Sequence, residues 1–229
     1  FSSYALRGTV YHSIFEQFVM NWNSDADLKS HQENLEKMAS DVIKIGTSNT
    51  ILQNFWRKGI NDISLSFIKD EIERQQEATS SAFERSGKLY IRGLNFEISG
   101  KADRIDLNKN GGAIIYDYKS GTLPSLKQQV AYDKQLYLLS LILQNGGFEG
   151  ISSTKVDAAF FVPIKPNLKK IHIPVDLESV EEFEVKLGEL LSAYLMLSTG
   201  FKARRALFLK QDYSPYDLSL IHISEPTRQ

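Results

Sequence analysis

The 229-residue chain contains no cysteine, and this absence excludes disulfides, cysteine-ligated zinc and iron–sulfur clusters. It is compatible with a reducing cytoplasm. The longest mostly apolar run, residues 136–143, is too short to span a bilayer, and no basic stretch followed by an apolar core opens the chain. We therefore expect a soluble protein with no targeting segment and no membrane contact.

An excess of charge of one sign is also lacking, because 27 lysines and arginines nearly balance 28 acidic residues. Net charge near zero gives no global attraction to nucleic acid, so a polyanion must be bound by local patches, a partner or a metal. With 42% hydrophobic residues and only 6 prolines, the chain can bury a full core. We expect one domain over residues 1–217.

The two ends of the chain carry their own expectations. It starts at Phe1 without an initiator methionine, which suggests a fragment of a longer protein. Residues 218–229 (LSLIHISEPTRQ) resemble translated sequencing-adaptor text, so we expect a non-native tail. His222 is therefore left out of any site.

Hydrophobic periodicity predicts both helices and strands. The helices are expected over residues 4–22, 27–45, 49–76, 125–144 and 177–197, and the strands over 88–92, 96–107, 113–119, 156–162 and 170–173. This order predicts an α/β fold with a mixed central sheet flanked by helices. Residues from about 27 to 80 form an N-terminal helical insert, to which we assign no chemistry. Its charge run, residues 69–74 (KDEIER), is interpreted as a solvated helix face.

The rest of the chain is organised around residues 100–119, GKADRIDLNKNGGAIIYDYK. The Asn-Gly-Gly sequence between two segments with β-branched and aromatic residues predicts a β-hairpin. If residues 108–112 form the loop, Leu107 pairs with Ala113 and Asp103 lies opposite Asp117. A two-residue turn at positions 110 and 111 would shift the pairing by one and move Asp117 to the other face.

Two directly opposed carboxylates, with Cβ atoms roughly 4.5–5.5 Å apart, repel each other unless a cation lies between them. Mg²⁺ takes oxygen ligands, usually one or two carboxylates with waters and phosphate. Lys119 shares the face of both acids and can hold a water or a developing phosphate charge. The pattern outlines a site of metal-assisted hydrolysis. The alternative is a set of cross-strand ion pairs on a solvated sheet face, formed by Asp103, Arg104, Asp106 and Lys119.

His12 and Glu16 lie four residues apart in the first predicted helix and therefore share a face. Beside a metal hairpin, a neutral His12 is a plausible further ligand, with Glu16 orienting or supporting it. The alternative is an exposed His–Glu pair on a solvated helix face.

Four motifs in order resemble those of RecB-family nucleases, which belong to the PD-(D/E)XK superfamily. They are RGTVYHSIFE (residues 7–16), GKADRID (100–106), YDYKSG (116–121) and QLYLL (135–139). Residues 100–150, with PSLKQ and GGFEG, further resemble the C-terminal nuclease domain of AddB, a subunit of the AddAB helicase-nuclease, in the alphaproteobacterial style. The resemblance covers most of residues 6–217, matches the insert poorly, and implies a PD-(D/E)XK (restriction-endonuclease-like) core.

The resemblance also implies roles for individual residues. His12, Asp103, Asp117 and the backbone carbonyl of Tyr118 would ligate Mg²⁺, for which Mn²⁺ can substitute. Lys119 would orient the attacking water or stabilise charge on the phosphate, and Gln135 would brace that lysine or the substrate. Apart from the resemblance, we expect Glu16 and Arg104 to support the site. The family's tyrosine four residues after the glutamine is Leu139 here, so Tyr137 or no residue takes its place. The iron–sulfur cluster of some relatives is excluded by the lack of cysteine.

The implied activity is that of a Mg²⁺-dependent, exonuclease-type deoxyribonuclease. It would act on DNA in the bacterial cytoplasm with an AddA-like helicase-nuclease partner subunit, in double-strand break repair and recombination. The alternatives are a catalytically silent DNA-binding scaffold, a stand-alone exonuclease or restriction-type endonuclease, and a purely structural α/β domain. Basic residues that could follow a DNA backbone, or simply be solvated, are Arg7, Lys165, Lys169, Lys170, Lys202, Arg204 and Arg205.

Overall fold

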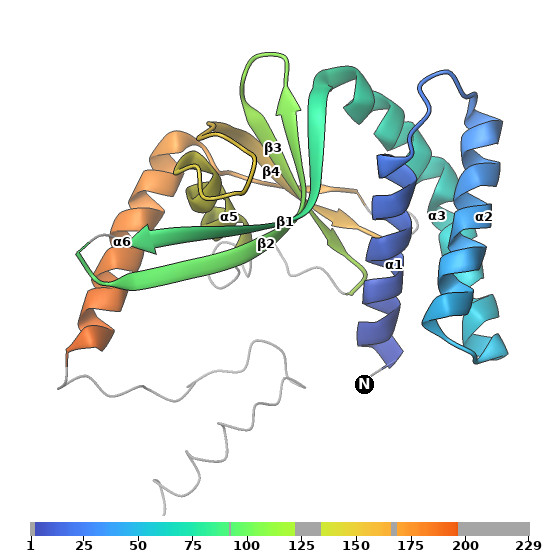
Figure 1. The fold of residues 1–229 in the computed structure, drawn as a ribbon, viewed down its shortest axis with the longest axis horizontal. Coiled ribbons are helices and arrows are strands. Elements are labelled where there is room, and N and C mark those ends of the chain that lie inside the picture. Colours follow the sequence, from blue (N-terminus) through green and yellow to red (C-terminus); the bar gives the residue numbers. More distant parts are fainter. Residues whose placement is uncertain (1–2, 92, 122–133, 166–168, 197–229) are drawn as a thin grey trace, which may run out of the picture. The chain divides into compact units, whose positions relative to one another are not determined.

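A computed structural model describes residues 3–91, 93–121, 134–165 and 169–196 (Figure 1). Contacts within the chain group into two units, residues 1–184 and 185–229. The second unit is described only for the end of helix α6 (Leu177–Leu195) and residue 196. The basic cluster at positions 202–205 and the tail 218–229 lie outside the described residues. The described part contains no helix that is long and apolar enough to cross a membrane.

Three helices precede the sheet, namely α1 (Ser3–Met20), α2 (Leu28–Gly46) and α3 (Thr50–Glu77). Local capping explains where α2 and α3 begin. The side chain of Asp27 accepts from the backbone N–H of Ser30 at 2.7 Å, and the side chain of Asn49 accepts from two N–H groups of the first turn of α3. The three predicted helices are confirmed to within about two residues at each end.

The sheet contains β1 (Ala78–Ile91), β2 (Phe96–Asn108), β3 (Ala113–Lys119), β4 (Val156–Pro163) and β5 (Ile171–Ile173), in the order β1-β2-β3-β4-β5. Strands β3 and β4 are parallel and the other neighbours are antiparallel, so the predicted mixed sheet is confirmed. Strand β1 is longer than the sequence predicts, because it follows α3 with no intervening turn.

The predicted hairpin loop is also confirmed. Leu107 pairs with Ala113, and the N–H of Asn108 donates to the carbonyl of Gly112 at 2.9 Å. The side-chain oxygen of Asn108 accepts from the N–H groups of Asn110 and Gly112, while Gly111 takes a positive φ of 78° that glycine adopts without strain. The loop therefore has five residues, and the alternative two-residue turn is excluded.

Going back along β2 from the hairpin loop, Arg104 is the last residue that pairs with β3, and the two strands part there. Beyond that point β2 remains paired with β1 as far as Phe96, and Figure 1 shows these two strands running away from β3 and β4 as a ribbon. The sheet thus forks between β2 and β3. Asp103 is the first residue of β2 in the fork.

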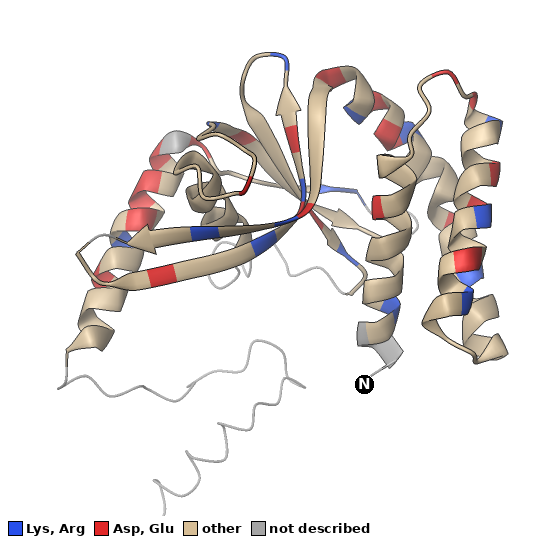
Figure 2. Ribbon diagram, viewed as in Figure 1, with Lys and Arg blue, Asp and Glu red and all other residues tan. Residues whose placement is uncertain are grey.

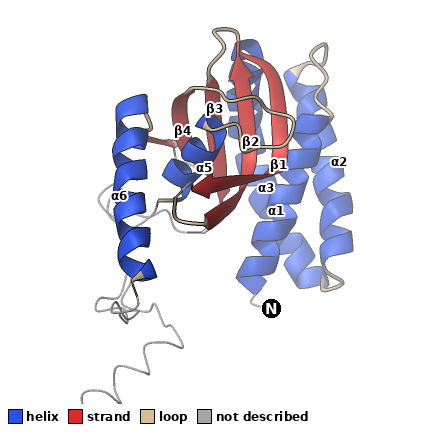
Figure 3. Cartoon of the chain, turned by 60° about the vertical axis from the view of Figure 1, so that its left-hand side comes forward, coloured by secondary structure: helices blue, strands red, loops and turns tan. Residues whose placement is uncertain are grey.

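Helices cover both faces of the sheet. Figure 3 shows α1, α2 and α3 on one side and α5 (Gln135–Gln144) on the other. The main apolar cluster joins the three N-terminal helices to residues of β3 and β4, namely Tyr116, Tyr118 and Val162, and to Ile164. On the opposite side, Leu139 and Ile142 of α5 pack against Gly100. The sheet is therefore held between two layers, and the fork lies beside α1.

The interpretation of residues 69–74 as a solvated face holds for Lys69, Asp70 and Glu73, which are exposed. It is wrong for Glu71, which is fully buried, and for Arg74, which is only 4% exposed. Glu71 Oε2 lies 2.6 Å from Arg104 Nη1 and 2.9 Å from Arg74 Nε. Arg104 also contacts Asp106 Oδ1 at 2.7 Å. Burial alone raises the pKa of Glu71, but the charges of Arg104 and Arg74 outweigh it and hold that pKa below its ordinary value. These charges tie α3 to the sheet inside the core.

Basic and acidic residues are interspersed along α2 and the β1–β2 ribbon, as Figure 2 shows, whereas α6 carries five glutamates and one lysine. This pattern agrees with the net charge of −1. Any strong electrostatic feature is therefore local.

Replacing Gly147 with alanine is expected to destabilise the protein. A Cβ at Gly147 would lie 2.1 Å from the carbonyl oxygen of Lys88, and the carbonyl of Gly147 itself accepts from the N–H of Lys88 at 2.9 Å. Since the backbone must shift to relieve this contact, unfolding should become easier by at least about 1–3 kcal/mol. Urea unfolding followed by circular dichroism measures the change.

The matched control for this substitution is Gly188→Ala in α6. Nothing lies within 4 Å of a Cβ at that position, so the change should stabilise the helix by roughly 0.5–1 kcal/mol. Equal stabilities for the two variants would contradict the packing of Gly147 against β1.

Candidate active site

Asp103 and His12 meet at the fork between β2 and β3. His12 Nδ1 from α1 lies 3.5 Å from Asp103 Oδ2, and both side chains are partly exposed. The same carboxylate oxygen accepts from the backbone N–H of Tyr118 at 2.8 Å. Counting along the ladder would set Asp103 directly opposite Asp117, but the ladder ends one residue earlier. The opening lets the imidazole reach the carboxylate from the side of the sheet.

Glu84 is a third potential ligand at this point, and the sequence pattern does not reveal it. Ligand atoms of His12, Glu84 and Asp103 all lie within 4.8 Å of one another. Glu84 has a positive φ of 50°, and it falls opposite Asp103 between two regular pairs of β1 and β2. Lys101 forms an ion pair with it. Extending the predicted strand 88–92 backward would not have found this residue, because pairing residues 92 and 96 sets Glu84 opposite Arg104. The observed pairing of Ile91 with Phe96 shifts it by one residue.

Asp117, Lys119 and Gln135 form a second cluster on the side of α5. Lys119 Nζ lies 2.7 Å from Asp117 Oδ2 and donates to Gln135 Oε1 at 2.8 Å. Gln135 Nε2 donates to Asp117 Oδ1 at 2.6 Å. Gln135 is the first residue of α5 and reaches both groups from there. The sequence predicts that this helix begins at residue 125, and residues 125–133 lie outside the described residues. Gln135 thus contacts the lysine that the resemblance expects it to brace, and its role in catalysis stays a prediction.

Burial and crowding of negative charge raise the pKa of three carboxyl groups here. Burial raises the pKa of Asp117 to about 6, with the nearby charge of Asp103 adding to the effect and Lys119 opposing it. Burial likewise raises the pKa of Asp103, although His12 and the Tyr118 N–H oppose the rise. For Glu16 the causes of the raised pKa are burial and then the charge of Glu84. Such a concentration of acids favours binding of a cation.

These donors fit a divalent metal ion of the Mg²⁺ or Mn²⁺ kind. Mg²⁺ and Mn²⁺ accept carboxylate oxygens, Mn²⁺ also accepts imidazole nitrogen, and neither needs a thiolate. His12, Glu84 and Asp103 line one open groove of about 430 Å³, together with Glu16, Lys101 and residues of the first turns of α1. Asp117 lies outside the group of three, although the charge of Asp103 is near enough to raise its pKa. A metal held here would be reachable from solvent through the groove.

The remaining predicted residues lie apart from this cluster. Arg104, expected to support the site, is fully buried on the α3 side of the sheet with Glu71 and Asp106, and its Nη1 is 3.5 Å from the Tyr118 hydroxyl. The Tyr137 ring packs against Phe183, with centroids 5.5 Å apart. Arg7 donates to the carbonyl of Ser120 at 3.2 Å, just beyond Lys119.

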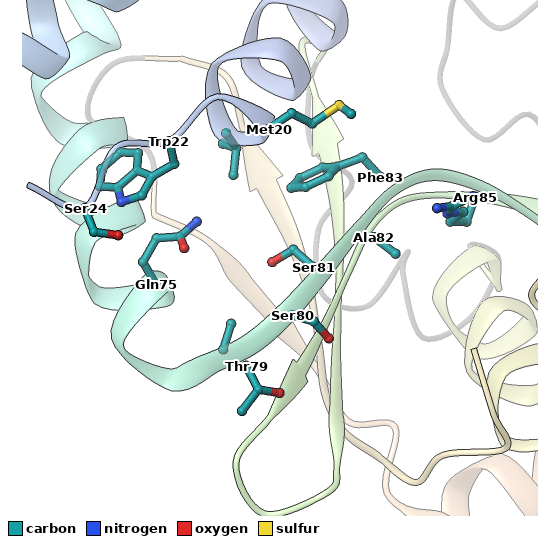
Figure 4. Close-up of a pocket in the computed structure, with 12 residues that line it drawn as sticks. Met20, Trp22, Ser24, Gln75, Thr79, Ser80, Ser81, Ala82, Phe83 and Arg85 are labelled. Carbon is teal, nitrogen blue, oxygen red and sulfur yellow. The ribbon is translucent and has the colours of Figure 1, made fainter. Parts of the chain in front are cut away.

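Another hollow, of about 420 Å³, lies between the ends of α1 and α3 and the start of β1 (Figure 4). Figure 4 shows Ser24, Gln75, Thr79, Ser80 and Ser81 around it, with Trp22 and Phe83 nearby. Its lining contains neither a carboxylate nor an imidazole. It therefore lacks the groups for metal-dependent chemistry, which are gathered at the fork instead.

Comparison with known proteins finds curated relatives in Rickettsia. An uncharacterized protein of Rickettsia bellii (strain RML369-C) is 24% identical over 207 residues, covering 82% of this chain and 25% of the relative. Another from Rickettsia felis (strain ATCC VR-1525 / URRWXCal2) is 32% identical over 151 residues, covering 62% of this chain and 17% of the relative. The chain thus spans about a quarter or less of these curated relatives.

The family model of the PD-(D/E)XK nuclease superfamily matches residues 2–208, which is most of the chain. The mixed sheet, its flanking helices and the acidic residues at the fork agree with that match. The chain belongs to the PD-(D/E)XK nuclease superfamily.

Proposed function

We propose that this chain is a nuclease domain of the RecB type, closest to the C-terminal nuclease domain of AddB, and that it hydrolyses DNA phosphodiester bonds with Mg²⁺. One observation carries the proposal. Residues from the four sequence motifs form two neighbouring clusters, with His12 beside Asp103, and with Lys119 and Gln135 around Asp117. Tyr118 joins the clusters, because its N–H donates to Asp103 and it stands between Asp117 and Lys119 in β3.

The metal would be held by His12, Asp103 and Asp117, with Glu84 and the Tyr118 carbonyl as further ligands. When bound, Mg²⁺, or Mn²⁺ in its place, would polarise a phosphate oxygen and lower the pKa of a coordinated water. Asp103 is oriented for this role by the N–H of Tyr118. Glu16 lines the same groove and adds negative charge that favours a cation.

Lys119 supplies the positive charge that the protein itself brings to the reaction. Its ammonium has three N–H donors, so it can donate to a phosphate oxygen while keeping its contacts with Asp117 and Gln135. Gln135 holds Nζ in place by accepting from it, which limits reorganisation during the reaction. As water attacks phosphorus and the ester bond to the leaving sugar oxygen breaks, negative charge builds up beside this ammonium.

The cellular role forms part of the same proposal. We place the domain in a bacterial cytoplasmic helicase-nuclease that acts in double-strand break repair and recombination, with DNA and an AddA-like subunit as partners. The similarity of residues 100–150 to AddB supports this placement. The greater length of the relatives is compatible with it, since this chain spans about a quarter or less of them.

The proposal is tested with the chain as it stands, linear labelled DNA, and Mg²⁺, Mn²⁺ or EDTA. Wild type should degrade the DNA with either metal and not with EDTA. Lys119→Met should slow cleavage by about 10²–10³-fold, as expected for the loss of one group that stabilises developing charge, while Mn²⁺ still binds. Electron paramagnetic resonance of Mn²⁺ measures binding.

The control is Lys109→Met, because Lys109 is an exposed residue of the hairpin loop. It should cleave like wild type. Full cleavage by Lys119→Met, or cleavage in EDTA, would overturn the proposed mechanism. Metal and DNA binding without any cleavage by wild type would identify a silent scaffold.

A further inference from the structure

Besides the groove at the fork and the hollow of Figure 4, a further groove runs between α1 and α3. We call it the α1–α3 groove. Its volume is about 310 Å³, and it is lined by Arg7, Tyr11, Phe55, Lys58, Gly59, Asp62, Ile164 and Lys165. None of the proposed metal ligands lines it. Its contents therefore need an explanation apart from the metal chemistry.

Two hydrogen bonds to backbone carbonyls connect this groove to the end of β3. Arg7 donates to the carbonyl of Ser120, the residue that follows Lys119. The N–H of Ile164 donates to the carbonyl of Lys119 at 2.9 Å. A chain lying in the α1–α3 groove would thus pass the backbone at the end of β3, and it would have to continue around this end to reach the Lys119 ammonium on the α5 side.

Basic side chains outnumber acidic ones along the groove. Arg7, Lys58 and Lys165 line it against Asp62. A smaller adjoining hollow shares Ile164 and Lys165 and adds Lys170 and Asp70. In a chain with a net charge of −1, this local excess of positive charge favours a polyanionic ligand.

An exposed aromatic ring lies among these cations. Phe55 is 61% exposed although it belongs to the helical insert, whose other aromatic residues, Trp56 and Phe67, are buried. Phe55 and Lys58 are three residues apart and share a face of α3. Aromatic rings stack on bases while nearby cations pair with phosphates, and a base can stack in this way only when it is unpaired.

We propose that the α1–α3 groove binds single-stranded DNA and leads it to the candidate site, with a base stacked on Phe55 and phosphates near Arg7, Lys58 and Lys165. This inference rests on the proposed function. It assigns to the helical insert a role in substrate binding. The groove would favour a single strand over a duplex, because paired bases cannot present a face to Phe55.

The test measures binding in EDTA, so that hydrolysis plays no part. Fluorescence anisotropy compares a labelled oligothymidylate with a duplex of equal length at several salt concentrations. Phe55→Ala should weaken single-strand binding by about 5- to 150-fold and leave duplex binding nearly unchanged. Lys58→Gln should reduce the salt dependence of single-strand binding by about 0.7 in log–log slope.

Two control variants match these changes. Phe96→Ala removes another exposed aromatic ring, at the far end of β2, and Lys155→Gln removes an exposed lysine before β4. Both should bind like wild type.

A crosslink from 5-iododeoxyuridine in the oligomer, mapped by mass spectrometry to the peptide that contains residue 55, provides a second measurement.

Unchanged single-strand affinity in Phe55→Ala, or equal losses for single strand and duplex, would overturn the inference. The former would leave Phe55, with exposed Ile45 and Ile51 nearby in sequence, as a surface for protein contact. Because these measurements need no cleavage, they also separate the two proposals. A chain that binds as expected yet never cleaves DNA would refute the nuclease mechanism and leave the groove assigned.

Discussion

Asp103→Asn is expected to abolish metal-dependent DNA cleavage and to weaken Mn²⁺ binding in the same variant. The substitution keeps the size of the side chain but removes the charge from the group that lies between His12 and the Tyr118 N–H. Charge stabilisation by a catalytic metal amounts to several kcal/mol, so cleavage should fall by about 10³-fold or more. Cleavage of linear DNA and Mn²⁺ paramagnetic resonance measure the two effects.

Glu97→Gln is the matched control, because Glu97 is an exposed acid of the same strand, paired only with the exposed Lys88 among the described residues. It should retain both metal binding and cleavage. If Asp103→Asn kept full Mn²⁺ affinity while losing cleavage, Asp103 would act on the substrate and not on the metal. Full cleavage by a folded Asp103→Asn protein would refute the proposed site.

The hairpin was predictable because its determinants are local. Asn108 closes the loop through its own side chain, and Gly111 supplies the positive φ, so the register follows from a few adjacent residues. Capping by Asp27 and Asn49 fixes the starts of α2 and α3 in the same local way. For His12, the spacing with Glu16 leaves a metal ligand and an exposed pair as alternatives, and the resemblance favours the ligand, since nothing in its own helix indicates which strand it meets.

What the sequence does not reveal depends on contacts between distant elements. Glu84 joins the site because β1 extends past the predicted strand and because a non-glycine residue there takes a left-handed conformation. In the sequence, Glu71 and Arg74 belong to a charge run that predicts a solvated face. In the structure, Glu71 is buried against Arg104, which lies 33 residues further along the chain. Phe55 reads as part of an apolar helix face, yet it lies exposed beside lysines. Periodicity shows which residues share a face, but not what that face meets.

Arg104→Met is expected to destabilise the protein strongly, and by more than Gly147→Ala does. Among the residues that the structure describes, it leaves Glu71 with only Arg74 as a cationic partner, and it removes the guanidinium that contacts buried Asp106. Removing one partner from a buried ionic network leaves an uncompensated charge and costs about 3–5 kcal/mol. Urea unfolding measures the loss, with Arg85→Met on neighbouring β1 as a control, because Arg85 is exposed and should lose little.

The same variant also tests whether Arg104 supports catalysis. Its guanidinium lies on the α3 side of the sheet, and Asp117 and Lys119 contact α5 on the other side. Adjacent side chains of a strand point to opposite faces, so Arg104 and Asp103 have separate surroundings despite being neighbours in sequence. Arg104→Met at a temperature where it remains folded should therefore bind Mn²⁺ like wild type. A loss of metal binding by the folded variant would show that the buried network also positions Asp103, and Arg104 would then have the supporting role expected from the sequence.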